Sequence, residues 1–334
     1  MGCATTERSR TFAGFDTYRF LRLQPANVFS LWMIGGVYLD AWAHHQFAVE
    51  TFFTPWHGVL YSGFLAVAAL LAFTFARNLA SGYPWREAMP AGYGLSLLGA
   101  GVFLAGGIGD MLWHMLFGIE VNLEALLSPT HLLLAVGGAL IATGPLRAAF
   151  NRLGYRSPGL PALISLSLLL AVLAFFTAYA HPLIEAIGGE QTGSERALTV
   201  TGILLQTGLL MGVVLFALRR WELPFGSLTL MFTLSTLLAV GIHENFEMLP
   251  VGVLSGLAAD FLQAQLKPST GNSGALRWFA FSVPVIFYTF YFATRAFTGS
   301  LDWTVHLWAG SIFLSGIAGL LMSYAIVPPF AAEK

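Results

Sequence analysis

The sequence predicts an all-α protein: a polytopic helical bundle of about nine transmembrane helices in one membrane domain, 1–334. Of its residues 56% are hydrophobic and 10% charged, whereas a soluble domain carries roughly 25% charged residues. The mean hydropathy is +0.71, and apolar runs of about 20 residues, long enough to cross a bilayer, recur along the chain. The lipid bilayer is therefore the expected surrounding. The net charge of −1 gives no indication of a nucleic-acid partner.

Each apolar run is expected to be a helix, because a segment in lipid must satisfy its own backbone polar groups. The expected spans cover 28–46, 56–77, 92–115, 129–149, 160–181, 197–218, 225–246, 275–296 and 303–326. The first four form two helical hairpins, 28–77 and 92–149, and the remaining helices occupy 160–326. The segment 251–266 is short and carries Asp260, so we expect an interfacial or re-entrant helix there and a C-terminus outside.

The short loops predict the orientation, because cytoplasmic loops of membrane proteins are rich in Lys and Arg. Alternate loops contain the arginines Arg77, Arg86, Arg147, Arg152, Arg156, Arg219 and Arg220. We therefore expect these loops and the N-terminus in the cytoplasm, and the protein in the cytoplasmic membrane of a bacterium or archaeon. The first 25 residues hold four arginines and no apolar core, which argues against a cleaved signal peptide. Cys3 is the only cysteine, so an intrachain disulfide and a cysteine metal cluster are excluded.

The stretch "YLDAWAHHQFAVETFFTPWH", 38–57, gathers polar residues between the first two spans. Asp40 and His44 are four residues apart and share one helix face. Thr54 and Pro55 are typical of a helix start, with a hydroxyl cap and a proline in the first turn. His57 then falls in the first turn of the second span. A short loop makes these helices antiparallel neighbours, so all three polar side chains should lie at one depth.

The stretch "IGDMLWHMLFGIEVNLEALLSPTH", 108–131, repeats this arrangement about 70 residues later. Asp110 and His114 close one span, and Ser128-Pro129 places His131 in the first turn of the next. Glu50 and Glu120 both follow their aspartate by ten residues. The sequence thus predicts a tandem repeat of one helical hairpin.

Two histidines and a carboxylate that converge from two helices form a plausible metal site. Ionisable groups at membrane depth are costly and usually mark function, and imidazole binds copper, zinc and iron well. We predict Asp40, His44, His57, Asp110, His114 and His131 as metal ligands. Glu50 and Glu120 could orient the histidines as hydrogen-bond acceptors. The alternative is interhelical hydrogen bonding without a metal.

Other polar residues are expected at the same membrane face, with their roles left open among ligand, proton relay and structural bridge. They are His181, Glu185, His243, Glu244 and Glu247, with His45 expected in a loop. Asp302 and His306 share the four-residue spacing but have no Pro-x-His partner, which shows how easily that spacing arises. The candidate catalytic residues are Glu50, Glu120, His243 and Glu244.

The pattern Asp40-x3-His44-x12-His57 resembles the intramembrane copper-binding pattern in the C subunit of particulate methane monooxygenase and ammonia monooxygenase. Asp110-x3-His114-x16-His131 resembles that subunit's following Asn-x3-His-x13-His pattern, with Asp for Asn and a longer loop. The resemblance covers roughly 28–135, and the chain has more spans than the family. It implies copper near the outer leaflet and O2-dependent hydroxylation of a small apolar substrate. We separately expect companion membrane subunits or a homo-oligomer.

Three classes of function follow from these residues. The first is a copper-binding membrane oxidoreductase, a monooxygenase or a subunit of one. The second is an intramembrane zinc-dependent hydrolase with Glu244 or Glu50 as general base, although "HENFE" departs from the HExxH of zinc peptidases. The third is a non-enzymatic metal-handling, haem-binding or transport protein. Copper is the expected metal, with zinc and iron as alternatives.

Overall fold

The computed structural model describes residues 23, 25–47, 52–118, 122–152, 156–184 and 192–328. These residues form helices joined by loops, with one isolated bridge between Ser269 and Asn272 and no strand among them. The helices are α2 Pro25–Gln46, α3 Pro55–Ala80, α4 Gly94–Phe117, α5 Asn122–Leu127, α6 Pro129–Ala142, α7 Gly144–Phe150, α8 Leu160–Phe176, η1 Ala178–Ala180, α9 Gly193–Arg220, α10 Ser227–Gly241, η2 Phe246–Met248, α11 Leu249–Leu266, α12 Ser273–Phe297 and α13 Val305–Ile326. The predicted all-α class is confirmed for the described residues.

Six of the described helices are long and apolar enough to cross a membrane. They are Pro55–Ala80, Gly94–Phe117, Gly193–Arg220, Phe246–Leu266, Ser273–Phe297 and Val305–Ile326. The pair α6 and α7, bent by 43° at its break, would make a seventh, while α8 and α10 are shorter apolar helices. The prediction of a helical membrane protein is confirmed by these six apolar helices, and the count of nine spans stays a prediction.

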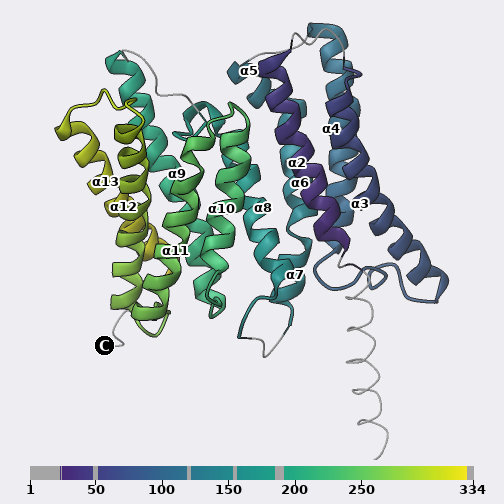
Figure 1. Cartoon of the computed structure of the whole chain (residues 1–334). Helices are drawn as coiled ribbons and strands as arrows, with labels where there is room; N and C mark the ends of the chain where they lie inside the picture. The colour runs from purple at the N-terminus through teal and green to yellow at the C-terminus, as the bar shows by residue number, and fades with distance from the viewer. Residues whose placement is uncertain are drawn as a thin grey trace, which may run out of the picture.

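The helix α11 lies where the sequence predicts an interfacial or re-entrant segment. It packs against α10 and α12, and Figure 1 shows it running beside them. Asp260 is 1% exposed and accepts hydrogen bonds from the backbone N–H groups of Leu228 and Thr229, at 3.1 and 2.9 Å. The aspartate that suggested a membrane-surface helix therefore caps the first turn of α10. The interfacial position stays a prediction, but this residue no longer argues for it.

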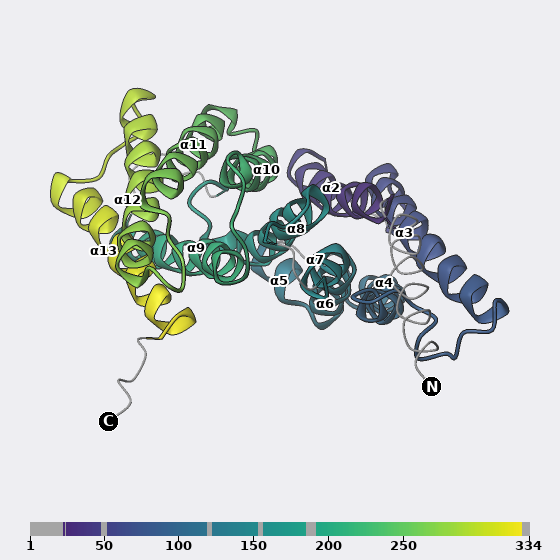
Figure 2. The same ribbon diagram turned by 90° about the horizontal axis from the view of Figure 1, so that it is seen from below.

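Two apolar cores meet at α8. One is built mainly from α2, α3, α4, α6 and α8, and the other mainly from α8 to α13. Figure 2 shows α8 between these two groups of helices. The hydroxyl of Tyr38 on α2 donates to the carbonyl oxygen of Ala171 on α8 at 2.8 Å, which fixes the first hairpin to this shared helix.

Hydrogen bonds from arginines join several helix ends at one end of the bundle. Arg147 of α7 donates to the carbonyl oxygen of Gly92 before α4 at 2.8 Å. Arg220 at the end of α9 donates to the carbonyl oxygen of Arg152 at 3.3 Å. Arg219 donates to the carbonyl oxygen of Ile326 in α13, also at 3.3 Å. We call this the basic end; its cations are Arg77, Arg86, Arg147, Arg152, Arg156, Arg219, Arg220, Lys267 and Arg277.

Candidate metal centre

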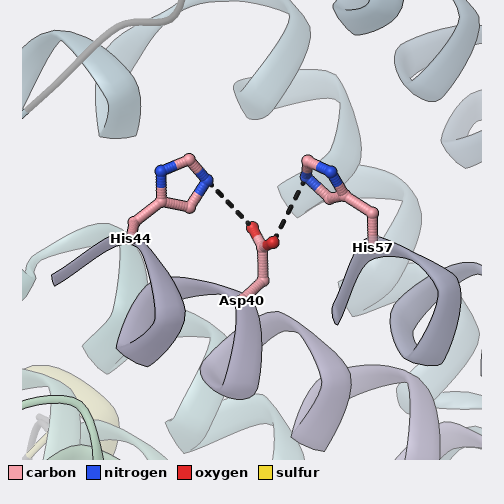
Figure 3. Close-up of side chains that lie close together, drawn as sticks. All are labelled: Asp40, His44 and His57. Atoms are coloured by element: carbon pink, nitrogen blue, oxygen red, sulfur yellow. Dashed lines mark ion pairs between the residues drawn. The ribbon is translucent and has the colours of Figure 1, made fainter. Parts of the chain in front are cut away.

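The first predicted triad is assembled at the end of the bundle opposite the basic end, where α2 stops and α3 begins (Figure 1). The Nε2 atom of His44 lies 3.6 Å from Oδ2 of Asp40, and Nε2 of His57 lies 3.3 Å from Oδ1. Figure 3 shows both imidazoles turned toward the carboxylate from either side. The side chains of Asp40 and His57 are 17% and 12% exposed, and His44 is the most exposed of the three at 31%. One ligand atom of each residue lies within 4.8 Å of the others, a grouping able to hold a metal ion.

The second predicted triad forms in the same way between α4 and α6. The Nε2 atom of His114 lies 3.5 Å from Oδ2 of Asp110, and Nε2 of His131 lies 3.1 Å from Oδ1. This site lies deeper, because the Asp110 side chain is only 3% exposed. The hydroxyl of Thr130 also donates to Oδ1 of Asp110 at 3.0 Å. Its three ligand atoms satisfy the same 4.8 Å grouping as the first triad.

The local sequence explains how the second histidine of each triad reaches its aspartate. The side-chain oxygen of Thr54 accepts a hydrogen bond from the backbone N–H of His57 at 3.3 Å. That of Ser128 accepts from the backbone N–H of His131 at 3.4 Å. Proline occupies the first turn of both helices. The predicted helix starts are confirmed, and they fix each histidine in the first turn, facing the end of the preceding long helix.

Glycines hold the helices of the first hairpin close together. A Cβ on Gly36 of α2 would come 2.6 Å from the Cα of Leu60 on α3, and a Cβ on Gly63 would come 2.7 Å from the backbone nitrogen of Met33. Real Cβ atoms essentially never approach that closely. Only glycine therefore permits the backbones to cross at this separation.

The second hairpin has glycines at the same offsets from its triad. A Cβ on Gly106 of α4 would come 3.1 Å from the backbone nitrogen of Leu134, and one on Gly137 of α6 would come 2.6 Å from that of Phe103. In both hairpins one glycine precedes the aspartate by four residues, and another follows the second histidine by six. The sequence reasoning missed these positions, although the equal spacing was visible.

Hydrogen bonds from the Nδ1 atoms determine the tautomer of two triad histidines. Nδ1 of His57 lies 2.6 Å from the carbonyl oxygen of Phe52, and Nδ1 of His114 lies 3.1 Å from that of Gly118. A carbonyl oxygen only accepts, so Nδ1 carries the hydrogen in both rings. In a neutral imidazole Nε2 then presents a lone pair, which here faces a carboxylate oxygen. Two electron-rich atoms in that arrangement require a positive centre between them, a proton or a metal ion.

The separations fit a metal better than they fit hydrogen bonds. Three of the four histidine–aspartate distances, 3.6, 3.3 and 3.5 Å, exceed the usual length of an N–H···O hydrogen bond, about 2.7–3.2 Å. Ligands about 2.0–2.1 Å from a tetrahedral ion are about 3.4 Å from one another. The Nδ1 atoms of His57 and His114, which donate to carbonyl oxygens, also agree with a metal site. Metal-binding histidines ordinarily donate their other N–H to an oxygen. The donor set and its spacing are therefore able to hold a metal ion in each triad.

The two triads are separated by aromatic side chains. The ring of Phe52 stacks on His57 with centroids 4.8 Å apart, and its centroid is 6.3 Å from that of His114 in the second triad. The Tyr61 ring lies 5.9 Å from that of Phe52 and 6.2 Å from that of His57. Tyr61 also lies beside Gly107, where a Cβ would meet its hydroxyl oxygen at 3.0 Å. The triads are thus neighbours in one aromatic environment.

The other candidate catalytic residues lie outside the two triads or outside the described residues. Glu50 and Glu120, together with Glu185, fall among residues that the structure does not describe. Glu244 accepts a hydrogen bond from the Trp42 indole N–H at 2.8 Å. His45 lies in the last turn of α2 and not in a loop as expected, and its ring is 4.1 Å from that of His243. These contacts support a structural bridge between α2 and the loop after α10.

The remaining histidines differ in their surroundings. His181 follows η1, lies in the protein interior and is only 9% exposed. His306 is exposed, and Asp302 lies outside the helix and 3.6 Å from Arg196. The same four-residue spacing therefore assembles no triad there among the described residues, which agrees with its treatment as a coincidence of sequence.

No family model, curated protein or solved structure matches this chain. The geometry of the two triads is therefore the basis for assigning a function.

Proposed function

We propose that the chain is an integral membrane metalloprotein that binds one copper ion in each Asp-His-His triad and acts as a copper-dependent oxidoreductase or as a subunit of one. One observation carries this proposal. The Nδ1 atoms of His57 and His114 are committed to carbonyl oxygens, so their Nε2 lone pairs face carboxylates at 3.3 and 3.5 Å. A metal ion resolves that arrangement without placing several charged imidazoles in a weakly solvated site.

Copper is preferred among the candidate metals for two reasons. Divalent copper binds nitrogen and oxygen donors more tightly than iron or zinc. The first triad also resembles the copper-binding pattern of the methane and ammonia monooxygenase C subunit, and the resemblance implies O2-dependent hydroxylation of a small apolar substrate. Bound copper would supply one-electron redox chemistry. In this proposal the residues of the chain hold the ion, orient the imidazoles through Phe52 and Gly118, and restrict water through the aromatic rings between the triads.

The distribution of charge supports a proposed topology. The basic end is assigned to the cytoplasm together with the N-terminus, which places both triads near the outer face of a bacterial or archaeal cytoplasmic membrane. The end of α13 also lies at the basic end, because Arg219 donates to the carbonyl oxygen of Ile326. The proposed topology therefore places the end of α13 in the cytoplasm, in contrast to the expected C-terminus outside. The equal glycine offsets support a tandem repeat of the hairpins 28–77 and 92–149. Companion membrane subunits or further copies of the chain complete the proposed assembly.

A zinc hydrolase is the second candidate, because three protein ligands with a further open position are also typical of catalytic zinc. Such an enzyme needs a general base beside the metal. Of its two candidate bases, Glu244 instead accepts a hydrogen bond from Trp42, outside both triads, and Glu50 lies outside the described residues. The oxidoreductase is therefore preferred.

Metal titration tests the proposal. The purified full-length protein is stripped of metal, titrated with Cu(II) and with Zn(II), and followed by metal analysis and EPR. We expect two copper ions per chain with nitrogen hyperfine structure, and about one in His57→Ala and in His131→Ala. The control His306→Ala, at an exposed position, should retain two. Unchanged copper in both triad variants would contradict the metal sites, while tighter zinc than copper would favour the hydrolase.

A further inference from the structure

A separate cavity of about 40 Å³ lies between α8, α9, α10 and α12. It has room for about three or four water molecules, or for a compact organic molecule of similar size. Its walls are mainly apolar and include Leu170, Phe232 and Phe287, and no residue of either triad lines it. Among the described residues that line it, none is Asp, Glu, Lys or Arg.

Gln206 offers this cavity a hydrogen-bond acceptor. The hydroxyl of Thr177 donates its single proton to the carbonyl oxygen of Leu173 at 2.7 Å. The contact of 2.8 Å between Thr177 and Gln206 must therefore be donated by the glutamine Nε2. This fixes the amide orientation and leaves Oε1 of Gln206 as the acceptor at the cavity wall.

His181 offers the same cavity a donor. Its Nδ1 accepts a hydrogen bond from the backbone N–H of Leu183 at 3.2 Å, so the ring proton lies on Nε2. This imidazole is only 9% exposed, and apolar surroundings favour its uncharged form. Two of the three hydroxyls in the lining are already engaged: Ser235 donates to the carbonyl oxygen of Met231 at 2.8 Å, and Tyr288 to that of Ile203 at 3.1 Å. The third, that of Thr236, lies against Gly252 of α11, where a Cβ would clash with its oxygen.

We propose that this cavity is a binding site for a short-chain alcohol. The alcohol oxygen accepts a hydrogen bond from Nε2–H of His181, its hydroxyl donates to Oε1 of Gln206, and its alkyl part lies against Leu170, Phe232 and Phe287. A hydroxyl matches one donor and one acceptor at once, whereas a ketone can use only the donor. The lining has no charged partner for an anion or a cation. The inference goes beyond the metal sites and does not depend on them.

Isosteric ligands test this site in the full-length protein, with saturation-transfer NMR to measure binding of 2-propanol, acetone and acetate. Each has four non-hydrogen atoms, but only 2-propanol both donates and accepts. We expect saturable binding of 2-propanol, binding of acetone weaker by about fivefold for the lost hydrogen bond, and no binding of acetate. Ala174→Leu adds volume inside the cavity and should abolish binding of 2-propanol. Any signal that remains in this variant measures partition of 2-propanol into detergent or lipid.

The variant Gln206→Leu should remove the preference for 2-propanol over acetone. Gln265→Leu makes the same chemical change at an exposed position of α11 and should retain the preference. Equal binding of 2-propanol and acetone by the wild type would overturn the proposal, and that comparison needs no variant to fold. Binding that survives Ala174→Leu, or the absence of saturable binding of either compound, would also overturn it, the latter indicating a cavity that holds only water.

Discussion

Nε2 of His57 lies 3.3 Å from Oδ1 of Asp40, yet that oxygen accepts no hydrogen bond from any residue that the structure describes. Leaving a buried acceptor unsatisfied costs about 1–3 kcal/mol. The pairing of Asp40 with His57 is therefore locally unfavourable, and a cation held between them would relieve it.

Asp40→Asn should consequently reduce metal binding without reducing the stability of the metal-free protein. The amide can donate to Nε2 of His57, so we expect the metal-free variant to be at least as stable as the wild type while it loses one of two copper ions. Thermal unfolding without metal and copper analysis measure the two effects. Asp260→Asn is the matched control: it should lower stability, because Asp260 caps α10, and keep both ions. Destabilised metal-free Asp40→Asn would contradict this explanation.

Thr130→Val should weaken only the second site. The Thr130 hydroxyl donates to Oδ1 of Asp110 at 3.0 Å and so orients the carboxylate. Loss of such a partner typically lowers metal affinity by about 10–100-fold. Copper titration should show one weakened and one unchanged site. Thr74→Val, which removes a hydroxyl bonded to the carbonyl oxygen of Leu70 in its own helix, should change neither.

Alanine at the close glycine crossings should loosen the triads. In Gly63→Ala and Gly137→Ala the new methyl groups would meet the facing backbone at 2.7 and 2.6 Å, so the helices must separate. We expect a loss of about 1–3 kcal/mol in stability and weaker copper binding at the affected site. Gly35→Ala and Gly101→Ala are controls, since a Cβ there meets nothing within 4 Å. Equal effects of all four variants would contradict a role for the crossings.

Copper ions in the two triads should interact magnetically. Phe52 contacts His57 of one triad and His114 of the other, so the sites are close neighbours. With Cu(II) in both, the EPR lines should be broadened by dipolar coupling. They should sharpen in His131→Ala, which keeps only the first site. Identical line widths in the two proteins would place the occupied sites too far apart for this arrangement.

The sequence was sufficient to predict the helical class, the two triads and the capped helix starts, because these depend on local spacing. Asp40 and His44 are one helical turn apart, and Pro55 fixes the start of α3 close to His57. The contacts of Asp260 were not predictable, since they depend on which helices pack together. The roles of His181 and Gln206 also depend on helices distant in the chain. The glycine offsets could have been noticed, but their meaning required the crossing geometry.

The close helix crossing and the triad occur together within each hairpin, so each hairpin contains all the residues of one site. Its signature has five fixed positions: Gly-x3-Asp-x3-His, a variable turn, and then His-x5-Gly. The turn varies from 12 to 16 residues between the two copies without disturbing the site, so it should also tolerate insertion of a tag or a sensor domain. These five positions supply a search pattern for related hairpins in membrane proteins whose overall sequences have diverged too far to be aligned.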